Sequence, residues 1–183
     1  TFTVGYLTQS GKTRHAIAMP GKKAAPLGFD KHDHGLCMDQ ALAAVSAHCA
    51  ENHLRLTPVR RKVLELLLLE HRALGAYAIL DMLRAAGFGS QPPVVYRALD
   101  FLLEHGFVHK IERLNAYVAC VHPGESHSPA FMICRRCDAV AEAETASAKG
   151  ALGAAARAAG FQIERAVLEA EGICSTCAEK ALP

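Results

Sequence analysis

Residues 92–121 read PPVVYRALDFLLEHGFVHKIERLNAYVACV and decide the fold. The first half predicts a helix that opens at the two prolines, continues to His105 and stops at Gly106. After this glycine, apolar residues alternate with a period of two over 107–111 and 116–121, which flank a short polar loop. This alternation predicts a β-hairpin. Helices followed by such a hairpin are typical of a winged helix-turn-helix.

Three further helices are predicted upstream of this stretch. The first is indicated by apolar residues that recur at helical spacing, namely Met38, Leu42, Val45 and Cys49. Thr57 is a good N-cap and Pro58 suits the first position of the second helix. A third helix runs from about residue 76 and stops at Gly87. Residues 38–121 are therefore predicted to form a winged-helix DNA-binding domain.

The chain downstream of the hairpin predicts a second, smaller domain. Residues 122–129 are expected to form a hinge loop. Strands are then expected at 130–134 and 139–144, a helix from Thr145 to about Ala159, and another strand over 161–171. Residues 130–183 would thus form a small α/β domain, and the fold class is α+β.

The first 37 residues are expected to form a flexible basic tail. Residues 1–38 carry 5 Lys and Arg against 2 Asp and Glu, residues 39–111 carry 8 against 7, and residues 112–183 carry 7 against 9. The formal net charge of +2 therefore combines a basic tail, a mildly basic middle segment over residues 39–111 and an acidic second half. So small a net charge does not count against a nucleic-acid partner.

Composition narrows the class of protein. The chain has 183 residues, of which 51% are hydrophobic, and this content excludes a fully disordered protein. We expect no membrane span, because no apolar run approaches the roughly 20 residues that a spanning helix needs. We also expect no secretory signal peptide and a cytoplasmic location. The 7 cysteines are an odd number, which disfavours a closed disulfide framework in a reducing compartment.

Two C-x-x-C pairs indicate a structural metal site, formed by Cys134, Cys137, Cys174 and Cys177. Four thiolates complete a tetrahedron around zinc and leave no open position for catalysis. Two independent redox pairs, disulfides and a zinc nucleobase deaminase are weaker alternatives. Neither pair is expected to lie at a thioredoxin-like transition from strand to helix, and no H-x-E motif accompanies them. Such a site would fasten the end of the chain to the first strands of the second domain.

A second set of ligand-type residues lies around the domain boundary: His109, Cys120, His127 and Glu142. One thiolate, two imidazoles and one carboxylate suit zinc, and the two anionic ligands balance its charge. From spacing alone this signal is weak to moderate. Each residue taken singly is more often a core residue or a solvated charge than a ligand.

The chain resembles the ferric uptake regulator family, and within it the zinc uptake regulators. The resemblance rests on residues 55–60 (RLTPVR), residues 92–102 (PPVVYRALDFL) and the paired cysteines, and it covers about Met38 to the C-terminus. It implies a zinc-responsive transcriptional repressor, not an enzyme, that binds a palindromic double-stranded DNA operator as a homodimer. The genes controlled would be those of zinc uptake and homeostasis, and residues 130–183 would be the dimerisation domain.

The resemblance also implies two zinc ions per subunit. The four paired cysteines would hold the structural ion, and His109, Cys120, His127 and Glu142 would hold the regulatory one. His122 is the alternative to His127, because the loop after Cys120 is short. The soft thiolate of Cys120 favours zinc over iron.

The fourth helix is expected to enter the major groove of the operator. Tyr96 and Arg97 lie in its N-terminal half, and Arg97 can donate two hydrogen bonds to guanine. Tyr77 matches a family position near the DNA. The other expected contacts are phosphate contacts by Arg60 and Arg61. The alternatives to these DNA contacts are that Tyr96 belongs partly to the core and that the arginines are simply solvated.

Asp81 and Arg84 have a spacing of i, i+3 on the third helix. The plain interpretation is a surface ion pair of little energetic value. The resemblance implies instead reciprocal contacts between two dimers on one operator.

Zinc bound across the hinge would set the separation of the two reading helices in the dimer, which must match the half-site spacing. The alternative within the family is a paralogue that senses iron, manganese or peroxide. Outside it, a zinc-dependent hydrolase, a thiol oxidoreductase or a simple interaction module are less favoured, because no catalytic base or nucleophile is identifiable.

Overall fold

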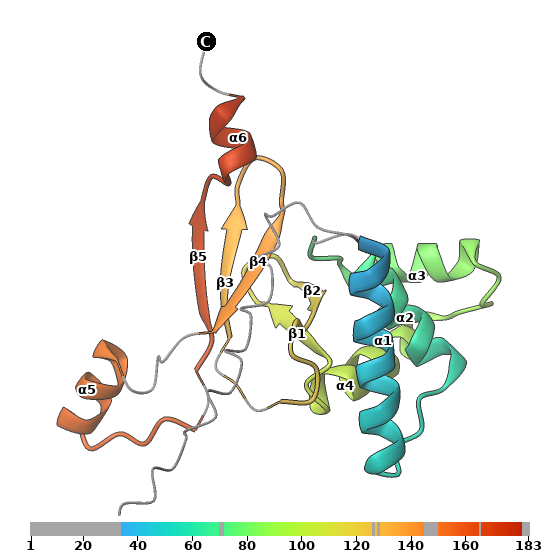
Figure 1. Cartoon of the computed structure of the whole chain (residues 1–183), viewed down its shortest axis with the longest axis horizontal. Coiled ribbons are helices and arrows are strands. Elements are labelled where there is room, and N and C mark those ends of the chain that lie inside the picture. Colours follow the sequence, from blue (N-terminus) through green and yellow to red (C-terminus); the bar gives the residue numbers. More distant parts are fainter. Residues whose placement is uncertain are drawn as a thin grey trace, which may run out of the picture.

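The structure is a computed structural model, and it describes residues 34–69, 72–125, 127, 129–144, 150–164 and 166–180. The expected basic tail lies outside the described residues up to residue 33, as does the expected helix start at Thr145. In these residues, four helices come first, a two-stranded hairpin follows, and a three-stranded sheet with two further helices completes the chain order. Figure 1 shows the hairpin lying between the helices and the larger sheet.

The first four helices agree with the sequence pattern. Their bounds are α1 His34–Glu51, α2 Pro58–Leu68, α3 Ala76–Ala85 and α4 Pro92–Glu104. Thr57 caps α2, since its hydroxyl oxygen accepts a hydrogen bond from the N–H of Arg60 at 3.4 Å. Helix α1 begins at His34, earlier than the periodicity from Met38 predicts. Leu36 in this first turn is 57% exposed, so it adds no core position to the apolar pattern.

The hairpin, called the wing below, joins β1 Val108–Ile111 to β2 Ala116–Ala119. The strands are antiparallel, and Ile111 pairs with Ala116 across the four-residue turn. Asn115 closes this turn with φ +45°, a left-handed conformation that asparagine tolerates. The predicted winged helix-turn-helix is thus confirmed.

The second half contains β3 Pro129–Cys134, β4 Val140–Glu144, α5 Ala151–Ala158, β5 Leu168–Gly172 and α6 Ser175–Glu179. The sheet order is β4-β3-β5, with β4 antiparallel and β5 parallel to β3. The strand predicted from Phe161 begins only at Leu168. Phe161 is 66% exposed, so the alternation that precedes β5 does not mark a buried face.

Two apolar cores organise the described part of the chain. The larger one lies among the four helices and includes residues at the start of the wing. The smaller one joins the wing to the sheet, because Ile111 and Val118 pack with Phe131, Ile133 and Val140. Burial of these side chains holds the wing against the sheet. Among the described residues, no helix combines the length and the hydropathy needed to cross a membrane.

Candidate metal centres

Two groups of His, Cys, Asp or Glu among the described residues could hold a metal ion, and they are the two predicted sets. In the first, the sulfurs of Cys134, Cys137, Cys174 and Cys177 lie within 4.8 Å of one another. The Sγ atoms of Cys137 and Cys174 are 3.8 Å apart. Four sulfurs at roughly 2.3 Å from one zinc ion would be separated by about 3.8 Å. The geometry therefore fits a tetrahedral ion.

The fold brings these cysteines together from both ends of the second domain. Cys134 ends β3, and the turn that carries Cys137 closes at Asp138 with φ +55°. Cys174 comes just after β5, which lies parallel to β3 with Gly172 opposite Cys134. The N–H of Cys174 donates to the sulfur of Cys134 at 3.4 Å. The parallel pairing thus positions the second C-x-x-C beside the first.

The electrostatics of this cluster favour a cation. Backbone N–H groups of Cys174 and Arg136 lower the pKa of the Cys134 thiol to about 6. Hydrogen bonding to Cys137, together with burial, raises the pKa of the Cys177 thiol to about 12. Ionisation of Cys134 thus favours the protonated form of Cys177. A divalent ion at the centre would displace those protons and satisfy all four sulfurs.

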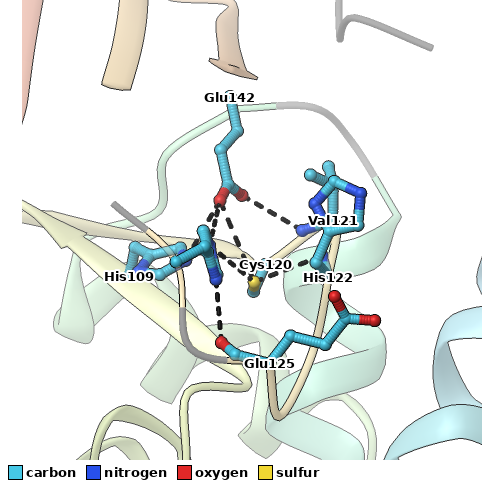
Figure 2. Close-up of polar contacts among 7 residues, drawn as sticks. His109, Cys120, Val121, His122, Glu125 and Glu142 are labelled. Carbon is cyan, nitrogen blue, oxygen red and sulfur yellow. Dashed lines mark hydrogen bonds and ion pairs between the residues drawn. The ribbon is translucent and has the colours of Figure 1, made fainter. Parts of the chain in front are cut away.

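The second cluster joins the wing to the sheet. His109 is on β1, Cys120 follows β2, His127 is in the loop between β2 and β3, and Glu142 is on β4. Their ligand atoms lie within 4.8 Å of one another. Figure 2 shows the Glu142 carboxylate directed at the His109 ring and the Cys120 sulfur. Three parts of the chain that are separate in sequence therefore meet at one point.

The distances fit a tetrahedral set of mixed ligands. Donors at roughly 2.0–2.3 Å from one zinc ion would lie about 3.3–3.8 Å apart. The His109 Nε2 is 3.2 Å from the Glu142 Oε1, and the Cys120 Sγ is 3.5 Å from the His127 Nε2. The separation of Cys120 Sγ from Glu142 Oε1 is 3.9 Å. The His127 Nε2 is closer to Glu142 Oε1, at 2.7 Å, which is the length of a direct hydrogen bond.

Backbone groups orient these ligands. The second carboxylate oxygen of Glu142 accepts the N–H of Val121 at 3.0 Å (Figure 2). The His127 Nδ1 lies 2.9 Å from the carbonyl oxygen of Glu125. Because a carbonyl oxygen can only accept, Nδ1 carries the hydrogen, and Nε2 is the nitrogen that faces the cluster. The N–H of His122 donates to the Cys120 sulfur at 3.3 Å. The backbone therefore fixes three ligands from outside the cluster.

The charge state of the cluster is also suited to a cation. Burial opposes ionisation of Glu142, but the nearby His109 ring and the hydrogen bond from the N–H of Val121 outweigh it and lower the pKa of this carboxyl. Burial and the adjacent Glu142 raise the pKa of the Cys120 thiol well above its usual range. The buried Nε2 of His109 has no hydrogen-bond partner of good geometry. A dication would satisfy this nitrogen and allow the thiol to ionise.

The structure places His127, rather than His122, among the four converging side chains. The rings of the two histidines are 6.0 Å apart at their centroids. The backbone N–H of His122 contacts Cys120, so this residue supports the cluster through its main chain.

Residues 51–171 match the sequence model of the Ferric uptake regulator family. The zinc uptake regulation protein of Escherichia coli (strain K12) is 44% identical over 141 residues, which are 76% of this chain and 82% of that protein. This chain belongs to the ferric uptake regulator family. The expected family membership is thereby confirmed.

Solved structures of this family extend the similarity to three dimensions. A zinc uptake regulator complexed with zinc and DNA is 43% identical, has a TM-score of 0.73, and is matched over 78% of this chain and 96% of its own. The crystal structure of holo XcZur is 44% identical with a TM-score of 0.70, over 77% and 99%. The similarity therefore extends over about three quarters of the chain and nearly the whole length of each solved structure.

The residues predicted from the sequence to contact DNA lie on the helical half. Tyr96 and Arg97 are exposed on α4, and Tyr77 on α3 is 69% exposed. Arg61 is exposed and forms an ion pair with Glu65 at 3.1 Å. The sequence-based alternative of Tyr96 in the core is not observed, since this side chain is 42% exposed.

Arg60 has a different environment from Arg61. Its guanidinium carbon is 3.7 Å from the centre of the Phe101 ring, and Nη1 donates to the carbonyl oxygen of Arg55 at 2.6 Å. A cation above an aromatic face is a stabilising contact. Arg60 therefore anchors α2 to α4, a role that the sequence alone did not suggest.

Asp81 and Arg84 form the expected pair on the surface of α3. The Arg84 Nη1 is 3.5 Å from the Asp81 Oδ1, and the two side chains are 49% and 76% exposed. An exposed pair of this length contributes little to stability. Both side chains remain accessible to a second molecule.

Proposed function

We propose that this member of the family is a zinc-responsive transcriptional repressor. In its zinc-loaded form it binds palindromic operator DNA as a homodimer in the cytoplasm and controls genes of zinc uptake and homeostasis. It is a regulator and not an enzyme. Support comes from its similarity to zinc uptake regulators, one of them solved with zinc and DNA. The observation that carries the proposal is the His109, Cys120, His127 and Glu142 cluster between wing and sheet.

Two zinc ions per subunit follow from the two ligand sets. The four cysteines would hold a structural ion, because four thiolates leave no open coordination position. The mixed cluster would hold the regulatory ion. Its single thiolate and two imidazoles favour zinc over the harder ions that an iron- or manganese-sensing paralogue requires. When bound there, zinc would supply a double positive charge that draws the four ligands together.

The ligands of the mixed cluster couple the metal to the orientation of the wing. His109 is part of the wing, Cys120 directly follows it, and Glu142 belongs to the sheet. Convergence of the four side chains therefore fixes the wing against the sheet. In a homodimer joined through the second domain, this sets the distance between the two α4 helices. A palindromic operator demands one such distance.

On the DNA, α4 would lie in the major groove. Arg97 would read a guanine, while Tyr96 and Tyr77 contact nearby parts of the operator. Arg61 would contact a phosphate, and Arg60 would hold α2 in place for that contact. The exposed Asp81 and Arg84 would pair reciprocally between two dimers on one operator.

A gel shift with a palindromic, AT-rich duplex tests the proposal. The full chain is titrated in buffered zinc, with EDTA as the control and with iron or manganese in parallel. Retarded DNA should appear as free zinc rises and should disappear with EDTA. Binding that follows iron, manganese or peroxide instead of zinc would assign the chain to a paralogous sensor.

A further inference from the structure

The turn of the wing is held by a carboxylate from the other domain. The N–H of Glu112 donates to the Glu169 Oε1 at 2.7 Å, and the N–H of Arg113 donates to Oε2 at 3.2 Å. Each oxygen of one side chain on β5 thus accepts one backbone donor from the turn between β1 and β2. Hydrogen bonds from N–H groups to an ionised carboxylate are stronger than those between neutral groups.

An ion pair lies beside this contact. The Nε of Arg113 is 2.6 Å from the Glu171 Oε1, two residues along β5. Both side chains are partly exposed, at 55% and 37%, so this pair alone contributes little. The two backbone hydrogen bonds to Glu169 differ from it, because main-chain donors lose little conformational freedom on bonding.

Glu169 lies in the same row of the sheet as the metal-cluster residue Glu142. Phe131 on β3 pairs with Glu142 on one side and with Glu169 on the other. Residues directly opposite one another on neighbouring strands point to the same face of a sheet. This face meets the wing, since the Phe131 ring lies 5.4 Å from the His109 ring. One row therefore contacts the wing at three points.

We infer that Glu169 is a positioning residue for the regulatory switch. It fastens the turn of the wing to the sheet, while Glu142 and the other ligands fasten the wing near its base. The inference rests on the proposed function. A wing that Glu169 already holds in place brings His109 and Cys120 to Glu142 at a lower entropic cost. Glu169 thereby raises zinc affinity at the mixed cluster without touching the ion.

The experiment compares the full-length wild type with Glu169→Ala, Glu169→Gln and Glu171→Gln. Zinc affinity of the mixed cluster is measured without DNA by chelator competition, with the four-cysteine site loaded. Glu169→Ala should weaken this affinity about fivefold to twentyfold, a typical range for coupling between sites. Glu169→Gln keeps one acceptor oxygen and should give an intermediate loss. Glu171→Gln removes only the exposed ion pair and should stay within about twofold.

Amide hydrogen exchange gives a second readout that needs neither DNA nor the regulatory ion. The Glu112 and Arg113 amides should be protected in the wild type and in Glu171→Gln, and should exchange faster in Glu169→Ala. Fast exchange in the wild type, or wild-type zinc affinity in Glu169→Ala, would overturn the inference. An equal loss of zinc affinity in Glu171→Gln would also overturn the inference, because the negative charge of β5 in general, and not the hydrogen bonds of Glu169, would then explain the affinity. A wild type that binds operator equally with and without zinc would refute the proposed function instead, and the exchange result would still stand.

Discussion

The carboxylate of Glu142 on β4 lies 3.2 Å from the Nε2 of His109 on β1. This contact joins the sheet of the second domain to the wing of the first. Glu142 also meets His127 and the N–H of Val121, so both of its oxygens are committed. A ligand set that spans two domains can convert occupancy by a metal into a change of orientation.

Replacing Glu142 should uncouple DNA binding from zinc. Glu142→Ala removes one ligand and one balancing charge, so zinc affinity at the mixed cluster should fall by at least about 10–100-fold. Operator affinity at intermediate free zinc should fall in parallel, whereas the four-cysteine ion should stay bound. Anisotropy of a labelled operator in buffered zinc measures this. Glu51→Ala, at an exposed site on α1, is the control and should behave as the wild type.

The four-cysteine cluster should be required for the folded second domain. Cys134→Ser removes a ligand that ends β3, so the β3–β5 pairing should loosen as the ion is lost. Native mass spectrometry should show a lower zinc count, and amide exchange in β5 should rise. Cys37→Ser on α1 is a matched control that should keep both ions. A Cys134→Ser chain that stays folded and metal-replete would disprove a structural role.

Arg97 should determine specificity at one base of the operator. Arg97→Ala should cost about 1–3 kcal/mol of operator binding and relax the preference at that position. Competition among duplexes that each carry one base change measures the effect. A uniform loss across all duplexes would mean that Arg97 contacts only the DNA backbone.

Arg60 and Arg61 should separate into a structural and a DNA-binding role. Arg60→Ala loses the contact with the Phe101 ring, which is worth about 0.5–2 kcal/mol, and should lower the free energy of unfolding. Arg61→Ala should leave stability nearly unchanged but reduce the slope of operator affinity against salt by about 1. Urea unfolding and salt-dependent anisotropy measure the two effects. Equal stability losses would contradict this separation.

Asp81 should affect cooperation between dimers rather than the binding of one dimer. Asp81→Ala should leave the affinity for an operator that holds one dimer unchanged and lower the cooperativity on a longer operator. Footprint titration on both duplexes makes the comparison, with Asp39→Ala on α1 as the control. Unaltered cooperativity would mean that Asp81 and Arg84 form only a surface ion pair and do not join two dimers.

Local signals explain why much of the fold could be predicted. Thr57 and Pro58 mark the start of α2 through chemistry confined to a few residues, and the period change after Gly106 marks the wing. The C-x-x-C spacing likewise identifies its own ligands. The spacing of the mixed-cluster residues gave only a weak to moderate signal. It became convincing through the resemblance to a family, because its ligands come from three separate segments.

Features that depend on tertiary contacts could not be predicted. Glu169 binds the turn of the wing through two backbone N–H groups. Because every residue except proline carries such a group, no pattern of side chains in the sequence marks this contact. The contact between Arg60 and Phe101 depends on how α2 crosses α4. The strand was predicted to begin at Phe161 because this residue is apolar. Phe161 is exposed in the fold, and β5 begins only at Leu168.

Whether zinc in the mixed cluster controls DNA binding is tested most directly by the operator affinity of the full chain as a function of buffered free zinc, with the four-cysteine site kept loaded throughout. The affinity should rise over the same range of free zinc in which the mixed cluster fills, and Glu142→Ala should shift both curves to higher zinc together. An operator affinity that is the same in EDTA and in saturating zinc would contradict control of DNA binding by zinc.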